Sequence, residues 1–405
     1  MRGFWFCGAR SVFHNAGFSH INCYMKKLNK FQLKRVCVRC GVLVLSLVLL
    51  VCLPLVSIKK DENLALIYEG FIGKKSDYEG MIEIWNIDSF EGVNVSKTQL
   101  LTKATKMFQR RNKGLYFMVR NLTETECLNL LKSGQKPDLF SCSYGVADKV
   151  KEWVVGIDGD FDLSKNVLNA GRVNGMQKGV AWCANSYYLI STEKALLDAG
   201  KNKSDSLLDI CLNSGYKVEN KNKTKIVYSL EMGNSKYLLP QKALSSYYDN
   251  RGLSISNYLV NKDNLKQTSY SAYCNFVAGK STVLLGTRKD VLRVKNRESN
   301  GKLENVKIEK LSKFSDLVQF LFMSDIHDKN KRACVVDFVK YMTESQVQSM
   351  VEESGLMSVN KTQNNVQKQG VMQDITPYKI EDYELLNVFI GCTEIEKIQQ
   401  EFLAS

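Results

Sequence analysis

Histidine is almost missing from this chain of 405 residues, with three in all, two of them (His14 and His20) among the first 57 residues. The third, His327, lies in a polar stretch, and neither a Gly-x-Ser-x-Gly nor a His-Glu-x-x-His motif occurs. The sequence therefore gives no support to a serine or zinc hydrolase, and it indicates neither a metal site nor a cofactor. A hydrolase that uses carboxylates alone stays open as an alternative.

Asp and Glu are missing from residues 1–57, which carry eight Lys and Arg. The net charge of +14 would favour nucleic-acid binding, but the other 348 residues hold 48 basic and 42 acidic side chains, a net charge of +6. A single uncharged apolar run, residues 41–58, follows the basic residues. We therefore expect residues 1–58 to be a signal peptide or an N-terminal membrane anchor. The remainder is then exported to the extracellular side of a bacterial cytoplasmic membrane, without a nucleic-acid partner.

The cysteines do not form a recognisable disulfide framework. Five of the twelve lie in the first 57 residues, and the other seven are odd in number and widely spaced. We expect these seven to be small buried hydrophobic residues. Cys52 ends a segment, residues 49–52, that resembles the lipid-attachment motif of bacterial lipoproteins, although Val51 stands where a small residue is usual.

Hydrophobic periodicity predicts alternating strands and helices, and only four prolines interrupt it. Strands are expected at residues 81–87, 115–119 and 137–140, separated by two helices, the second capped by Thr123 and ended by Gly134. This order predicts a parallel sheet that is covered on both faces. Further strands are expected at 186–190, 225–228 and 282–285, and one helix at 335–353. The exported residues are numerous enough for two hydrophobic cores.

Two short motifs resemble ligand sites but depart from the required patterns. Gly279 to Thr282 reads like the end of a phosphate-binding loop, but the first glycine of that pattern is replaced by Cys274. We interpret it as a turn that enters a strand. Three alternating aspartates at 158, 160 and 162 resemble a calcium loop, but Leu163 and Asn169 occupy the positions of its glycine and its bidentate acid. We interpret this segment as a solvated acidic loop.

Aromatic and polar residues gather where two of the predicted strands end. Trp85, Asn86 and Asp88 lie at the end of the first strand, and Ser143 and Tyr144 follow the third. Ligands of such sheets bind beyond the carboxyl ends of the strands. Aromatic rings with amide and carboxylate groups suit a polyhydroxylated ligand, since rings stack on C–H faces and planar polar groups bind hydroxyls.

Six segments between residues 79 and 360 resemble, in order, those of the extracellular solute-binding proteins of ABC importers, the carbohydrate-binding branch in particular. They are residues 83–85, 101–119, 133–140, 179–187, 276–286, and 338–348 with 355–360. Within them, residues 276–286 are close to the family's Phe-x-x-Gly-Lys-x-x-hydrophobic-x-x-Gly strand.

This resemblance implies an α/β fold of two lobes, each a mainly parallel sheet flanked by helices, with the ligand in the cleft between them. Residues 79–165 with 308–355 would form lobe 1, and 166–307 with 356–405 would form lobe 2. A hinge of two or three crossings would let the lobes close, and importer permease subunits would recognise the closed form. The residues that would face the cleft are Trp85, Asp88, Glu91, Ser143, Tyr144, Trp182, Asn185, Arg288 and Asp290.

The resemblance predicts a binding protein for a carbohydrate-like solute and not an enzyme. Many sugar binders place an aromatic residue near Arg288, and an arginine there favours an acidic or phosphorylated sugar, because guanidinium binds carboxylate or phosphate in a fork. Two alternatives remain open. One is a membrane-anchored extracellular carbohydrate-active enzyme that uses Asp88 or Glu91. The other is a sensor or adhesin that keeps the binding fold.

Overall fold

The computed structural model describes residues 73–88, 90, 92–207, 210, 226–228, 268–310, 315–360, 380–383 and 385–391. The expected signal peptide or anchor, residues 1–58, lies outside this part of the chain, as does Glu91. Among the described residues, no helix combines the length and the apolar character needed to cross a bilayer.

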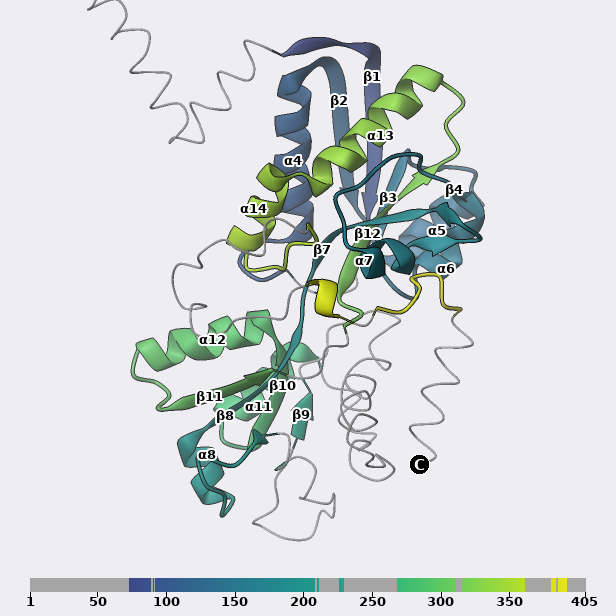
Figure 1. Ribbon diagram of the computed structural model, residues 1–405. Helices are drawn as coiled ribbons and strands as arrows, with labels where there is room; N and C mark the ends of the chain where they lie inside the picture. The colour runs from purple at the N-terminus through teal and green to yellow at the C-terminus, as the bar shows by residue number, and fades with distance from the viewer. Residues whose placement is uncertain are drawn as a thin grey trace, which may run out of the picture. The chain divides into compact units, whose positions relative to one another are not determined.

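The first sheet begins with the predicted alternation of strands and helices (Figure 1). Its elements are β1 (Lys74–Asn86), α4 (Lys97–Arg111), β2 (Asn112–Asn121), α5 (Glu124–Lys132) and β3 (Leu139–Cys142). β1 pairs in parallel with both β2 and β3. Both helices begin at a capping box, at Ser96 for α4 and at the predicted Thr123 for α5. The βαβαβ prediction is confirmed.

The other strands of the first sheet run antiparallel to their neighbours. The chain continues through α6 (Ala147–Val150), a 3-10 turn (Lys151–Trp153), β4 (Val154–Val155), α7 (Lys165–Ala170), the small antiparallel pair β5 (Arg172–Val173) and β6 (Met176–Gln177), and β7 (Gly179–Ala184). Much later, β12 (Val318–Ser324) enters this sheet antiparallel to β3, β4 and β7. The strand order is β2-β1-β3-β12-β4, with β7 paired to β12.

Aromatic packing joins α4 to the helix α13 (Lys329–Thr343) over β2 and β1 (Figure 1). Phe108 of α4 meets Phe338 of α13 with ring centroids 5.4 Å apart, and Phe117 of β2 meets Phe338 at 4.7 Å. These rings form the apolar core on this face of the first sheet.

The single helix expected at 335–353 is wrong, because the chain forms α13 and then a separate α14 (Ser345–Glu353). Side chains take the carbonyl oxygens that a continuous helix would use. Asn360 donates to the carbonyl of Thr343 and Gln348 to that of Met342. Glu344 between the helices is extended, at φ −70° and ψ 153°.

The second sheet has the order β11-β8-β10-β9. Its elements are β8 (Tyr187–Thr192), α8 (Glu193–Asp198), β9 (Ile226–Tyr228), α11 (Ser269–Val277), β10 (Val283–Thr287), α12 (Arg288–Ser299) and β11 (Val306–Lys310). β10 is antiparallel to β8 and parallel to β9. Tyr188, Phe276 and Leu284 belong to the buried cluster that joins this sheet to its helices.

Within the described residues, the chain changes sheet at two short segments, residues 185–186 and 315–317, which we call the crossing segments. The predicted lobe boundaries do not coincide with them. β7 lies within the expected lobe 2 but pairs with the first sheet, and residues 308–310 of the expected lobe 1 pair with the second sheet. Near the chain's end, Val388 donates to the carbonyl of Ala170 in α7. Hydrophobic pattern shows that a strand is buried but does not identify its partner strand, which explains the difference.

Candidate ligand-binding site

A polar network occupies the carboxyl ends of β1 and β3. Asn86, the last residue of β1, donates to Asp88 Oδ1 at 3.0 Å and to Asn121 Oδ1 at 3.0 Å. Its own Oδ1 accepts from Ser141 Oγ at 2.9 Å and from Gln319 Nε2 at 3.4 Å. Asn86 is fully buried, so this network fixes the strand ends that face the loop of residues 87–96.

A buried lysine fastens the loop that follows β1. Lys97 is fully buried, and its Nζ lies 3.3 Å from Asp88 Oδ1 and 3.5 Å from the centroid of the Phe90 ring. It also donates to the carbonyl of Phe90. A buried cation needs such partners, and here a carboxylate, a carbonyl and a ring face supply them.

The crossing segments are joined by hydrogen bonds that involve two residues of the predicted site. Ser143 Oγ donates to the carbonyl of Val318 at 2.6 Å. The backbone N–H of Asn185 donates to the carbonyl of Leu317 at 2.7 Å, and its carbonyl accepts from Ser315 Oγ at 2.8 Å. Both changes of sheet therefore pass through one hydrogen-bonded region.

Tyr187 and Asp316 form a buried pair beside this region. The hydroxyl of Tyr187 donates to Asp316 Oδ1 at 3.1 Å, and Asp316 is 1% exposed. Burial raises the pKa of the Asp316 carboxyl well above its ordinary value near 3.8, although the hydrogen bond from Tyr187 opposes the shift. Burial and the Asp316 charge also hold the pKa of Tyr187 well above its usual value, which keeps the tyrosine a donor.

Four buried polar atoms at or next to the crossing segments have no hydrogen-bond partner among the described residues. Two are donors, Asn185 Nδ2 and Arg288 Nε, and two are acceptors, Asp316 Oδ2 and Gln319 Oε1. All four residues are at most 4% exposed. Buried polar groups in native proteins are nearly always paired, so these donors and acceptors are suited to a polar partner, although Gln177, Ser281 and Ser324 also have unpaired buried atoms elsewhere.

The aromatic residues expected to face a ligand lie in the interior instead. Trp85 is 1% exposed, its Nε1 donates to Glu83 Oε1 at 2.7 Å, and its ring meets Phe140 edge-on. Trp182 is fully buried and its Nε1 donates to Ser141 Oγ at 3.2 Å. Tyr144 is also fully buried, with its hydroxyl bonded to the carbonyl of Leu386 at 2.8 Å.

The remaining expected residues divide between the network and the second sheet. Asp88 is about one-third exposed and pairs with Lys97. Asp290 caps α12 by accepting from the N–H of Thr287, and it pairs with Arg293 at 3.2 Å. Arg288 is buried at the start of α12. Sequence reasoning did not select Tyr187, Asp316 or Gln319, which carry no motif of their own and show their role only through these contacts.

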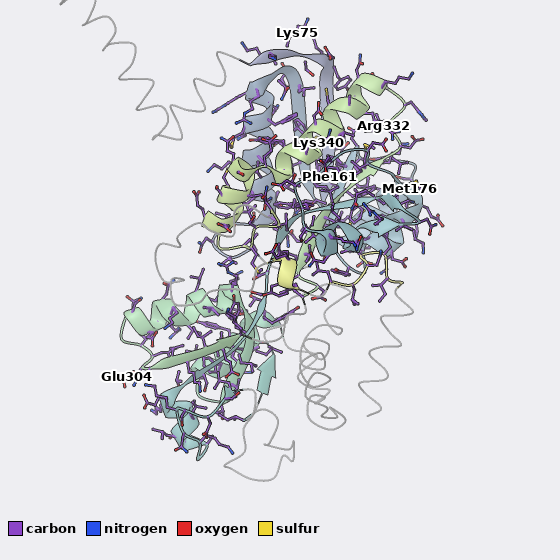
Figure 2. All side chains as sticks on the ribbon, in the orientation of Figure 1. Lys75, Phe161, Met176, Glu304, Arg332 and Lys340 are labelled. Carbon is purple, nitrogen blue, oxygen red and sulfur yellow. The ribbon has the colours of Figure 1, made fainter. Side chains whose placement is uncertain are left out.

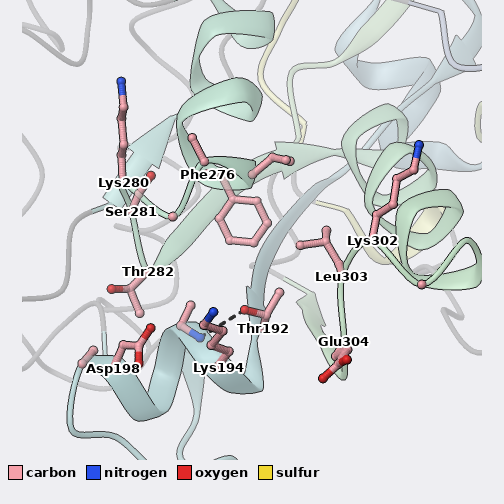
Figure 3. Close-up of a pocket in the computed structure, with 16 residues that line it drawn as sticks. Thr192, Lys194, Asp198, Phe276, Lys280, Ser281, Thr282, Lys302, Leu303 and Glu304 are labelled. Carbon is pink, nitrogen blue, oxygen red and sulfur yellow. Dashed lines mark hydrogen bonds between the residues drawn. The ribbon is translucent and has the colours of Figure 1, made fainter.

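A cavity of about 830 Å³ lies at the other end of the second sheet (Figure 3). α8, residues 276–282 and the loop of residues 301–304 line it, with the Phe276 ring between Thr282 and Leu303. The phosphate-loop-like motif sits here, with Gly279 at φ +70° after α11 and β10 starting at Val283. The interpretation as a turn entering a strand is confirmed, since a phosphate loop would open a helix.

Two cations of α13 approach the acidic loop of residues 158–162, in which Asp158 is 95% exposed. Arg332 lies 3.5 Å from Asp158, and Lys340 approaches the Cα of Gly159 closely. Figure 2 shows Arg332 and Lys340 along α13, close to Phe161 of this loop. Within the described residues, no group of three or more His, Cys, Asp or Glu is arranged to hold a metal ion.

Solved structures resemble this chain in fold. No family model and no curated protein matches its sequence. The GacH receptor of Streptomyces glaucescens, solved unliganded and with acarbose, is 14% identical, with a TM-score of 0.58 over 80% of this chain and 92% of that one. A family 1 extracellular solute-binding protein of Bifidobacterium longum subsp. infantis is 13% identical, with a TM-score of 0.55 over 80% and 95%. The chain has the two-lobed fold of extracellular solute-binding proteins. The predicted fold class is confirmed.

A third solved structure is similar over the same share of this chain. The sugar-binding protein MalE of Xanthomonas citri is 13% identical to this chain, with a TM-score of 0.54 over 80% of this chain and 90% of that one. All three matches span nine-tenths or more of the other chain, so the likeness covers a whole solute-binding fold and not one lobe.

Proposed function

We propose that this protein binds a carbohydrate-like solute on the extracellular side of the membrane and delivers it to an ABC importer. The fold and the sugar ligands named for the GacH receptor and MalE support the class of ligand. The N-terminal run, residues 41–58, would export or anchor the chain, and closure about the crossing segments would enclose the ligand.

The four unpaired polar atoms at the crossing segments carry this proposal. They comprise two donors and two acceptors, all buried. A hydroxyl donates one hydrogen bond and accepts two, so a polyhydroxylated molecule can satisfy both kinds at once. An apolar ligand would leave all four unpaired, at a cost of about 1–3 kcal/mol for each neutral group.

The proposal is for binding without catalysis. Asp88, one of the two acids available to a glycosidase at this strand end, is held by the buried Lys97. Asp316 is buried against Tyr187 at the crossing segments. Each of these carboxyls therefore has a partner that fits a positioning role. The remaining acid considered, Glu91, lies outside the described residues.

A ligand screen with the full-length protein tests the function. The panel contains neutral sugars, sugar acids, sugar phosphates and, as a contrasting class, amino acids. A ligand that binds only the folded state adds about 2.7 kcal/mol at 100 times its dissociation constant, which raises the melting temperature measurably. We expect at least one member of the carbohydrate classes to produce this rise. A panel without any such rise would contradict the proposal.

A pair of variants then tests the site. Asn185→Leu removes the unpaired Nδ2, and with it the Oδ1 that accepts from the Ser186 N–H, with little change of volume. We expect the ligand-induced rise to be lost. Ser324→Ala is the matched control, because Ser324 Oγ is also buried and unpaired but lies at the far end of β12. Its rise should equal that of the wild type. Retention of the full rise in Asn185→Leu would show that the ligand binds elsewhere.

A further inference from the structure

Arg288 is a buried cation without a carboxylate partner among the described residues. It is 4% exposed, and only its Nη1 has a hydrogen-bond partner there, the carbonyl of Leu356 at 3.2 Å. Its Nε is buried and unpaired. The guanidinium stays charged at all ordinary pH values and carries five N–H donors, and the described residues use only a small part of this binding capacity.

Two other cations of the described residues, one buried and one half-buried, have carboxylate partners. Lys97 is fully buried and lies 3.3 Å from Asp88. Arg293, which follows Arg288 by little more than one helical turn, lies 3.2 Å from Asp290. Because burying an unpaired charge is expensive, a carboxylate beside the fully buried Lys97 is expected. Arg288 is the exception, although Asp290 is only two residues away in the sequence.

The unpaired guanidinium lies at the same end of the second sheet as the other unpaired atoms. Arg288 follows the last residue of β10, Thr287, which pairs in register with Tyr187. Tyr187 in turn binds Asp316, whose Oδ2 is unpaired. Arg288 also begins α12, a helix of 12 residues, whose N-terminal dipole favours negative charge at this point.

We infer that the ligand of this site carries an anionic group, a carboxylate or a phosphate, which Arg288 binds. The inference rests on the proposed function and names its ligand class. A planar guanidinium binds either group in a fork of two parallel hydrogen bonds. Arg288 is thus a specificity-determining residue, and the neighbouring unpaired atoms bind the hydroxyls of the same molecule.

Matched ligand pairs test the inference without any variant. Binding of glucuronate and galacturonate to the full-length protein is measured by calorimetry beside that of glucose and galactose. Glucose 6-phosphate forms a third arm that distinguishes a phosphate from a carboxylate ligand. We expect an acid to bind about ten-fold or more tightly than its neutral parent, since hydrogen bonds to charged groups are the stronger ones. Equal or tighter binding of the neutral parent would overturn the inference while the proposed function stands.

Three variants assign the selectivity to Arg288. Arg288→Gln should remove the preference for the anion, so that an acid and its neutral parent bind with similar affinity. Arg288→Lys, which keeps the charge but not the fork, should retain part of the preference. Lys280→Ala is the control, because this exposed cation lies at the cavity at the opposite end of β10, five residues or roughly 16 Å away. It should leave the preference intact.

The possible outcomes distinguish failure of the inference about Arg288 from failure of the proposed function. Undiminished anion preference in Arg288→Gln would remove Arg288 from the site. Absence of binding for every sugar, acid and phosphate would refute the proposed function and the inference together. Should Arg288→Gln fail to fold, the comparison of acids with neutral parents in the wild type and in Arg288→Lys gives the same decision.

Discussion

Replacement of Trp182 by Ala tests whether this side chain packs in the core or contacts the ligand. The family resemblance places Trp182 in the cleft, where its loss would abolish binding and leave the fold intact. In the structure Trp182 is fully buried in β7, and its Nε1 donates to Ser141 Oγ at 3.2 Å. We therefore expect Trp182→Ala to destabilise the protein.

The expected size of the effect follows from burial. A tryptophan buries about 150–250 Å² of surface, which at about 25 cal/mol per Å² corresponds to roughly 4–6 kcal/mol. Substitutions of buried aromatic residues by Ala cost about 3–5 kcal/mol. Trp182→Phe keeps most of the volume, and Ser141 Oγ still bonds with Asn86 and Gln319, so this variant should lose only about 1–2 kcal/mol.

Chemical denaturation measures both variants, with Tyr116→Ala as the control. Tyr116 is an aromatic residue of the same sheet but 65% exposed, and its substitution should change the free energy of unfolding by less than about 0.5 kcal/mol. The reasoning is refuted if Trp182→Ala unfolds at the same denaturant concentration as the wild type. If that variant also no longer bound ligand, Trp182 would be a ligand platform after all.

Two further predictions concern the crossing segments and the end of α14. Because burial raises the pKa of Asp316, the folded state holds this proton more tightly than the unfolded state, so stability falls as pH rises above about 4. Asp316→Asn should remove this loss, so that its advantage over the wild type grows with pH; a constant difference across pH would contradict this. Gly355 has φ +85°, and an added Cβ would lie 2.7 Å from Val93 Cγ1, so Gly355→Ala should lower the free energy of unfolding by about 1–3 kcal/mol. Gly301→Ala is the control, because Gly301 has φ +65° and open space around an added Cβ, so this substitution should lower the free energy of unfolding by less. If both substitutions lower it equally, the contact with Val93 does not explain the effect at Gly355.

Local patterns in the sequence predicted the elements of the first sheet well. Thr123 with Glu126 caps α5, and the chain turns at Gly134 with φ +82°, because each depends on a few neighbouring residues. Strand partners were harder. β7 and β12 pair across more than 130 residues, and nothing in either segment identifies the other. The lobe boundaries followed the chain order and so missed this pairing.

Of the candidate site, the sequence predicted only where a polar cluster lies. The carboxyl ends of β1 and β3 were correctly expected to carry a polar cluster, which the network of Asn86 and Ser141 forms. The aromatic residues of the same segments were expected to stack on a ligand. Adjacent residues of a strand point to opposite faces, and both faces of these strands are covered, so Trp85 and Trp182 are buried whichever face they occupy. Whether a tryptophan packs or binds depends on what covers it, and one strand does not contain that information.

The unpaired atoms at the crossing segments lower the stability of the unliganded fold, and under the proposed function they favour the binding of a polar ligand. Each buried unpaired neutral group costs about 1–3 kcal/mol, and an unpaired charge such as Arg288 costs more. Four of them amount to a large part of the total free energy of unfolding, about 5–15 kcal/mol for a domain. Under the proposed function, a polar ligand would recover this loss on binding. Apolar replacements of Asn185 or Arg288 would remove an unpaired atom but would also leave the Ser186 N–H or the Leu356 carbonyl without its side-chain partner.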